Sequence, residues 1–190
     1  MTILEKIIET KKSELEIVKK TISIEELKNL ENFRRKSVSL VERLKNSSHG
    51  IIAEHKRKSP SKSIINDSIL INQIIKGYDQ ADVCGISILT DKKYFGGSLD
   101  DLKNARELTN IPILRKEFII DEYQIIEAKA NGADVILLIA ACLDENQIMK
   151  FSLLAKEIGL EVLIEIHNEN ELKKCLIDTI DIIGVNNRNL

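Results

Sequence analysis

Short apolar runs alternate with amphipathic helical patterns from residue 50 onward. The runs are rich in Ile, Val and Leu and rarely alternate with polar positions, which is typical of parallel strands covered by helices on both faces. Their starts lie roughly 21 to 35 residues apart, the spacing of repeated βαβ units. We therefore predict six strands joined by crossover helices. The runs span 50–56, 85–90, 111–118, 133–141, 160–166 and 181–187, and the helical patterns span about 67–80, 99–108, 121–131, 144–158 and 168–177.

Residues that favour helix ends stand at the borders of these helical patterns. Asp121, Asp144 and Asn168 precede the last three, where an N-cap side chain accepts a hydrogen bond from the first turn. Gly132 and Gly159 follow helical patterns, where glycine tolerates the left-handed conformation that ends a helix. These positions support the predicted boundaries.

The chain before residue 50 has a different pattern. Residues 1–45 read as helical, with apolar residues at near-helical spacing between 3 and 18 and with Glu and Lys among them. A second amphipathic segment lies at about 34–46. We expect a helical extension over residues 1–48, followed by βα repeats over 49–190.

Two α/β architectures fit these repeats, a doubly wound open sheet and a (β/α) barrel. The G-x-G-x-x-G loop of a dinucleotide-binding sheet and the Walker A loop are absent from the sequence. Charged or amide residues lie at four strand ends, and a barrel brings many strand ends to one mouth. We therefore predict a (β/α)8 TIM-barrel type fold, of which this chain holds about six strands. The strand-end residues are Glu54, Lys56, Lys116, Glu165, Asn186 and Arg188.

Composition narrows the class of protein. The 190 residues carry a formal net charge of −2, and 43% of them are hydrophobic and 31% charged. These proportions are typical of a soluble globular protein. This charge argues against a general nucleic-acid or membrane-surface binder. No apolar run approaches the ~20 residues of a membrane helix, and the N-terminus lacks the apolar core of a signal peptide. The Cys and His residues are dispersed without metal-ligand spacing, so we expect no metal and a cytoplasmic location.

Four charged residues within apolar runs suggest acid–base chemistry. Burying a charged side chain in a dry core costs free energy, but at the barrel rim opposite charges can pair around a pocket. The four residues are Lys56, Lys116, Glu54 and Glu165. Two lysines and two glutamates suit proton transfer on an anionic substrate. The alternative for each residue alone is an exposed salt bridge. His55 should point outward toward the helices by strand alternation, and we expect it to be a packing residue.

Two loops offer further candidate contacts. The segment KRKSPSK (56–62) follows the first strand and suits phosphate or carboxylate binding; alternatively it is a solvated basic turn. The loop DKKYFGGS (91–98) carries Tyr94 and Phe95, which are placed to cover an aromatic substrate; alternatively the loop packs on the barrel.

Long ordered motifs from about residue 50 to the last residue resemble the indole-3-glycerol phosphate synthase family of tryptophan biosynthesis. The helical extension also fits this family. The motifs are IIAEHKRKSPSKS, ILTDKKYFGGSLDDL, PILRKEFIIDEYQIIEAKANGADVILLIAA, GLEVLIEIHNENEL and IGVNNRNL.

The resemblance implies a carbon–carbon lyase that needs neither metal nor cofactor. Such a carboxy-lyase closes the indole ring of 1-(2-carboxyphenylamino)-1-deoxyribulose 5-phosphate and releases carbon dioxide and water. The implied partner is this small phosphorylated substrate, without nucleic acid or membrane, and a complete barrel is expected to be a monomer.

The resemblance also implies roles for individual residues. Lys116 resembles the general acid of ring closure, and Glu165 resembles the acid–base residue of dehydration. Lys56 would be the cationic counterpart of Glu165, and Glu54 would orient the lysines. The implied substrate contacts are Ser59 and Arg188 for the carboxylate, Asn186 for a hydroxyl, and Phe95, Phe118 and Leu137 as apolar walls.

The family pattern continues past the sixth strand, through two further βα units whose loops hold the substrate phosphate. We therefore weigh an alternative in which the chain is a truncated, catalytically impaired barrel fragment that at most binds or associates through unpaired strand edges. A sugar-phosphate isomerase on the same fold and a non-enzymatic α/β binding module are further alternatives. The LRKEF and NNRNL motifs argue against the isomerase, and the density of motif residues argues against the binding module.

Overall fold

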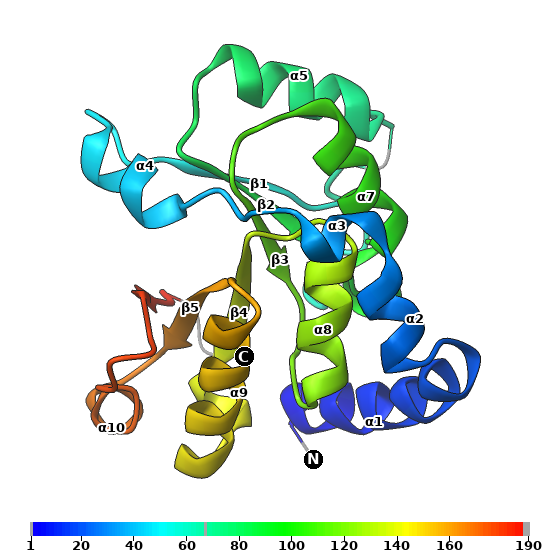
Figure 1. The fold of residues 1–190 in the computed structure, drawn as a ribbon, viewed down its shortest axis with the longest axis vertical. Coiled ribbons are helices and arrows are strands. Elements are labelled where there is room, and N and C mark those ends of the chain that lie inside the picture. Colours follow the sequence, from blue (N-terminus) through cyan, green and yellow to red (C-terminus); the bar gives the residue numbers. More distant parts are fainter. Residues whose placement is uncertain (1, 67, 188–190) are drawn as a thin grey trace.

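A curled parallel sheet forms the centre of the computed structural model, which describes residues 2–66 and 68–187 (Figure 1). The 6-stranded sheet has the order β1-β2-β3-β4-β5-β6, and each neighbouring pair is parallel. Within the described residues β1 pairs only with β2 and β6 only with β5, so the sheet is an open half-barrel. The strands are β1 (Ile52–His55), β2 (Gly85–Leu89), β3 (Ile113–Lys116), β4 (Val135–Ile139), β5 (Glu161–Ile166) and β6 (Ile182–Val185).

Every predicted apolar run contains one of these strands, which confirms the partial barrel. The crossover helices are also where the pattern predicts them, although the last one ends at Lys173, earlier than expected. None of the helices that the structure describes combines the length and apolar character that a membrane crossing requires. The helices after β1 are α5 (Ile71–Gln80), α6 (Lys92–Phe95), α7 (Leu99–Leu108), α8 (Glu122–Ala130), α9 (Glu145–Glu157) and α10 (Glu169–Lys173), with a 3-10 turn η1 (Ala140–Cys142).

The predicted helix caps are present. The Asp121, Asp144 and Asn168 side chains accept hydrogen bonds from the backbone N–H groups of the first turns of α8, α9 and α10. Gly132 and Gly159 adopt φ values of 94° and 76°, in the left-handed region that glycine favours. These local signals therefore determine where the crossover helices begin and end.

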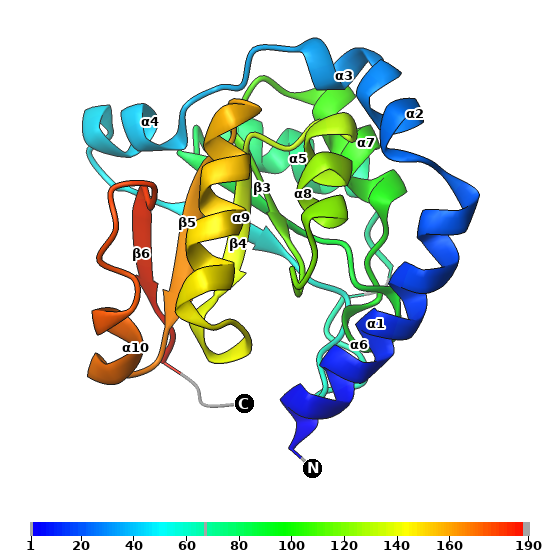
Figure 2. The same ribbon diagram turned by 60° about the horizontal axis from the view of Figure 1, so that its bottom comes forward.

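The N-terminal part is helical, but one predicted helix is shorter than expected. The N-terminal helices are α1 (Ile3–Thr21), α2 (Ile24–Asn29), α3 (Glu31–Arg34) and α4 (Leu40–Asn46). The segment predicted at 34–46 is interrupted, because α3 ends at Arg34, residues 35–39 are not helical, and Ser39 caps a new helix through the Glu42 N–H. In Figure 2 the α2 and α3 helices lie along the outside of α8, whereas α4 lies at the other side of the molecule, above β6.

The sheet separates two apolar clusters. The outer cluster lies between the strands and the crossover helices, and the inner cluster lies on the concave face. Ile7 of α1 and Leu40 of α4 belong to the inner cluster, so the N-terminal helices complete the interior. A Cβ atom at Gly85 would lie 2.6 Å from Leu40 Cδ1, so glycine is what allows Leu40 to enter beside β2.

A fully buried carboxylate joins the N-terminal part to the sheet. Asp134 lies immediately before β4 and is 0% exposed. Its oxygens accept hydrogen bonds from Arg35 at 2.7 Å, Arg106 at 2.7 Å and the backbone N–H of Val38 at 2.8 Å and Ile113 at 2.9 Å. A buried charge is stable only with such partners, so Asp134 holds the extended segment against the barrel.

Replacing Asp134 tests this connection. We expect Asp134→Asn to lower the free energy of unfolding by about 3 kcal/mol, because the amide leaves the buried guanidinium group of Arg106 and the half-buried one of Arg35 without their counter-charge. Asp178→Asn, at an exposed position, is the matched control. Equal denaturant midpoints for the two variants would contradict the role of Asp134.

Candidate active site

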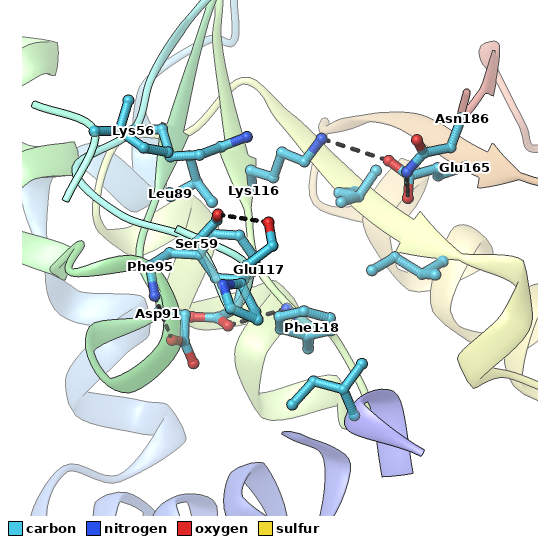
Figure 3. Close-up of a pocket in the computed structure, with 16 residues that line it drawn as sticks. Lys56, Ser59, Leu89, Asp91, Phe95, Lys116, Glu117, Phe118, Glu165 and Asn186 are labelled. Carbon is cyan, nitrogen blue, oxygen red and sulfur yellow. Dashed lines mark hydrogen bonds and ion pairs between the residues drawn. The ribbon is translucent and has the colours of Figure 1, made fainter. Parts of the chain in front are cut away.

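The carboxyl ends of the parallel strands meet around one cavity of about 900 Å³ (Figure 3). Lys56 follows β1, Lys116 ends β3, Glu165 is near the end of β5 and Asn186 follows β6. Parallel pairing brings these ends to the same rim, so residues far apart in sequence share a pocket. The predicted site residues that line it are Lys56, Ser59, Phe95, Lys116, Phe118, Leu137, Glu165 and Asn186.

Lys116 lies between two carboxylates. Its Nζ is 3.5 Å from Glu54 Oε2 and 3.4 Å from Glu165 Oε2. The Lys116 side chain is 31% exposed, so its ammonium group reaches the cavity while both glutamates are more buried. Opposite charges at these distances attract one another, which holds the lysine between the two glutamates. The arrangement provides a proton donor flanked by two proton acceptors.

Glu54 joins both lysines of the site. Its Oε1 is 2.7 Å from Lys56 Nζ, and its Oε2 accepts a hydrogen bond of 3.1 Å from Ser87. The strand register explains the second contact, because Glu54 and Ser87 are partners in the β1–β2 pair. Burial raises the pKa of Glu54, but Lys116, Lys56 and Ser87 together outweigh this and lower it below the ordinary value of 4.5.

Glu165 is positioned from the neighbouring strand. Its Oε1 accepts a 2.8 Å hydrogen bond from the Asn186 side chain, whose backbone N–H in turn donates to Ile166 at 2.8 Å. Because Asn186 holds one oxygen of Glu165, the other oxygen remains directed at Lys116.

Apolar side chains form the opposite wall of the cavity. The rings of Phe95 and Phe118 have centroids 5.9 Å apart and are tilted by 37°. Leu137 on β4 belongs to the same inner cluster. These groups offer a flat apolar surface beside the charged residues, which suits an aromatic ring that carries a polar substituent.

The loop after β1 contributes fewer cations to the cavity than its sequence suggests. Arg57 makes two hydrogen bonds to Asp101 of α7, at 2.7 and 2.8 Å, so it anchors the loop. Ser59 and Ser61 line the cavity, and their hydroxyl groups are 3.2 Å apart. The prediction of an anion-binding loop therefore rests on Lys56 and these serines.

The side chains of Tyr94 and His55 lie outside the cavity. Of the two aromatic residues of the loop 91–98, Phe95 lines the cavity, whereas Tyr94 packs toward α1 with its hydroxyl group 2.9 Å from that of Thr10, as the packing alternative predicts for it. Consecutive residues of a helical turn point in different directions, which separates Tyr94 from Phe95. His55 is 5% exposed and faces α5 beside Gln73, which confirms its prediction as a packing residue.

Sequence reasoning missed several lining residues, among them two acidic ones and one from the N-terminal extension. Asp91 and Glu117 are acidic and line the cavity, and Ile3 reaches it from the start of α1. Asp91 directly precedes the short helix α6 and caps it, and an Asp in this position is a pattern that the sequence alone can show. Glu117 is adjacent to Lys116 but carries no signal of its own, and the approach of Ile3 depends on tertiary packing.

Two predictions about the site lie beyond these observations. Arg188 lies outside the described residues. Among residues 2–66 and 68–187, no group of three or more His, Cys, Asp and Glu side chains is arranged to hold a metal ion. The absence of a cofactor stays a prediction.

Comparison with known proteins identifies the family. The family model for indole-3-glycerol phosphate synthase matches residues 4–190. The chain belongs to the indole-3-glycerol phosphate synthase family. A family member from Bacteroides thetaiotaomicron is 48% identical over 188 residues, covering 99% of this chain and 72% of that protein. A member from Neisseria meningitidis serogroup B is 42% identical over 192 residues, covering 99% and 74%. The match confirms the resemblance and disfavours the isomerase and binding-module alternatives.

Solved structures show the fold alone. The carboxyl transferase domain of Rhizobium etli pyruvate carboxylase aligns with a TM-score of 0.52 and 8% identity, over 71% of this chain and 27% of that one. This likeness agrees with the α/β fold described above.

The low pKa of Glu54 predicts a pH-dependent contribution to stability. A depressed folded-state pKa stabilises the fold above the ordinary value of 4.5, and the effect is lost as the pH falls through the lower folded value. We expect Glu54→Gln to lower the free energy of unfolding by about 1.5–3 kcal/mol at neutral pH. The loss should shrink in acid.

Urea unfolding over a pH series measures this difference. Glu157→Gln, at an exposed position on α9, is the control and should show no such trend. A Glu54→Gln effect that is constant across the series would contradict the assigned charge state.

Proposed function

We propose that the chain carries the acid–base groups of the indole-3-glycerol phosphate synthase reaction. The activity is that of a carbon–carbon lyase acting on 1-(2-carboxyphenylamino)-1-deoxyribulose 5-phosphate. The observation that carries this proposal is Lys116 between Glu54 and Glu165 at a cavity with a phenylalanine wall. Residues 1–48 would form the helical extension, and residues 49–190 the barrel part. A cytoplasmic setting follows from the family's biosynthetic role.

Ring closure requires a proton donor at the ketone. The aromatic carbon that bears the carboxylate attacks the ketone carbon, so a carbon–carbon bond forms while the carbonyl oxygen gains negative charge. Lys116 supplies a proton to that oxygen, which becomes a hydroxyl group. Its two flanking carboxylates hold the ammonium group at the rim of the cavity before the step.

Two eliminations then produce the indole. The bond to the carboxylate breaks, carbon dioxide leaves, and the bonding electrons restore the benzene ring. The new hydroxyl group leaves as water after protonation, and the neighbouring ring CH2 loses a proton. Glu165 is the acid–base residue of this dehydration, with Lys56 as the cationic counterpart. The Glu54 contact at 2.7 Å holds Lys56 toward the same pocket.

The substrate's parts match the remaining surfaces of the cavity. The anthranilate-type ring packs against Phe95, Phe118 and Leu137, and its carboxylate meets Ser59 on the loop after β1. Arg188 is proposed as a second carboxylate ligand and Asn186 as a hydroxyl contact. A hydrophobic wall beside the carboxylate favours loss of carbon dioxide by replacing its hydration shell.

The direct test is formation of the indole product from the substrate. The chain has no Trp, so the fluorescence of an indole product is not obscured by the protein. We expect Lys116→Met to reduce turnover at least ~100-fold, the scale of a lost general acid. Lys173→Met, at an exposed position on α10, should retain parent activity. Near-parent turnover by Lys116→Met would refute the acid role.

Glu165 offers a separate test because it acts at a later step. We expect Glu165→Gln to slow indole formation by about 100-fold while carbon dioxide is still released. The decarboxylated alcohol, one water heavier than the product, should accumulate and be detected by mass spectrometry. The exposed Glu169→Gln is the control. Parent-like indole formation without this intermediate would contradict the assignment.

A further inference from the structure

A buried lysine from the N-terminal extension lies behind the aromatic wall of the cavity. Lys11 of α1 is 5% exposed. Its Nζ is 2.8 Å from Asp91 Oδ2, 3.4 Å from Glu117 Oε1 and 2.6 Å from Glu14 Oε2. Burial alone would lower the pKa of Lys11, but the carboxylates of Glu117, Asp91 and Glu14 raise it above its ordinary value. Lys11 is therefore a permanent cation.

The two carboxylates from the barrel side belong to the loops that carry the phenylalanines. Asp91 follows β2 and Glu117 follows β3, and their side chains are 1% and 4% exposed. Both line the cavity. Without Lys11, Asp91 would have no cation beside it among the described residues, and Glu117 would keep only Arg115, whose Nη2 is 3.8 Å from Glu117 Oε2. Both carboxylates line a pocket that is proposed to receive an anionic substrate, so their charge opposes its binding.

Each carboxylate also holds one phenylalanine by its backbone. Asp91 Oδ1 accepts a hydrogen bond of 3.2 Å from the N–H of Phe95. Glu117 Oε1 accepts one of 3.0 Å from the N–H of Phe118. Lys11 thus touches both groups that fix the backbone of the two rings, whose centroids are 5.9 Å apart.

Glu117 also accepts a hydrogen bond from within the barrel, whereas the cation beside Asp91 comes from α1. Thr90 donates to Glu117 Oε2 at 2.7 Å and itself accepts from Arg115 at 3.1 Å. In the described part of the chain Lys11 is the only cation paired with Asp91. The α1 helix therefore ties the loop after β2 to the loop after β3.

We infer that Lys11 is a positioning residue for the aromatic-ring subsite. It sets the separation of Phe95 and Phe118 by joining the carboxylates that hold them, and it neutralises those carboxylates where the anionic substrate enters. This inference rests on the proposed function for the identity of the ligand. The N-terminal extension thereby takes part in substrate binding through a residue that contacts no substrate.

The test is the binding of a substrate analogue in which the ketone is reduced to an alcohol and ring closure is blocked. Binding is followed by the fluorescence of the 2-carboxyphenylamino ring, which a chain without Trp leaves unobscured. We expect Lys11→Met to raise the Kd, and the KM of the substrate, by roughly tenfold, the scale of a lost charged contact. The kcat should change less than threefold, since Lys116 and Glu165 are untouched. Lys12→Met, at the exposed neighbouring position, should match the parent.

A second substitution separates positioning from general stability. In Lys11→Met with Glu117→Gln, a carboxylate that would keep only its 3.8 Å contact with Arg115 is removed, while the amide oxygen still accepts from the Phe118 N–H. We expect the Kd of the analogue for this double variant to be at least threefold lower than for Lys11→Met. If Lys11→Met does not fold, Glu117→Gln is compared with the double variant, and a Kd about threefold weaker in the double variant supports the role.

The outcomes distinguish this inference from the proposed function. A parent chain that binds the analogue, beside a folded Lys11→Met with the same Kd and KM, overturns the role of Lys11 and leaves the function standing. Where Lys11→Met does not fold, an equal Kd for Glu117→Gln and the double variant has the same consequence. A parent that neither binds the analogue nor forms indole overturns the proposed function and this inference together.

Discussion

The ammonium group of Lys116 between the carboxylates of Glu54 and Glu165 is the interaction on which the site depends. These groups come from three different strands, so their meeting requires the parallel register and the curl of the sheet. Each charge is partly desolvated at the strand ends, and the opposite charges beside it, together with hydrogen bonds from Ser87 and Asn186, offset that cost. The same pairing that stabilises the rim keeps a proton donor next to proton acceptors. Stability and chemistry therefore share one set of contacts.

The N-terminal helices are part of this construction. Leu40 enters the inner cluster beside Gly85, and Asp134 binds the extended segment that leads to α4. On the other side of the cavity, Lys11 of α1 joins the two loops that hold the phenylalanine wall. The barrel strands supply the charged rim, while the extension closes the interior and supports the apolar wall.

Sequence patterns predict those features that depend on local chemistry. Strand runs, helix caps and strand-end charges such as Lys116 and Glu165 are visible because each follows from its neighbours in the chain. Tertiary partners are not visible in this way. Nothing near Lys11 or Asp134 in sequence indicates which carboxylates or guanidinium groups they meet, and Tyr94 and Phe95 are adjacent residues that only packing separates. Arg57 likewise looks like a ligand-binding cation until Asp101 of α7 is found beside it.

The central claim is that Lys116 delivers a proton to the substrate's ketone oxygen while the ring rests on Phe95 and Phe118. A crystal structure with the ketone-reduced analogue bound tests it most directly, because the alcohol oxygen marks the position of the ketone oxygen. The account predicts that this oxygen accepts a hydrogen bond from Lys116 Nζ, with the carboxyphenyl ring against both phenylalanines. An analogue bound in the cavity with that oxygen directed away from Lys116 would contradict it.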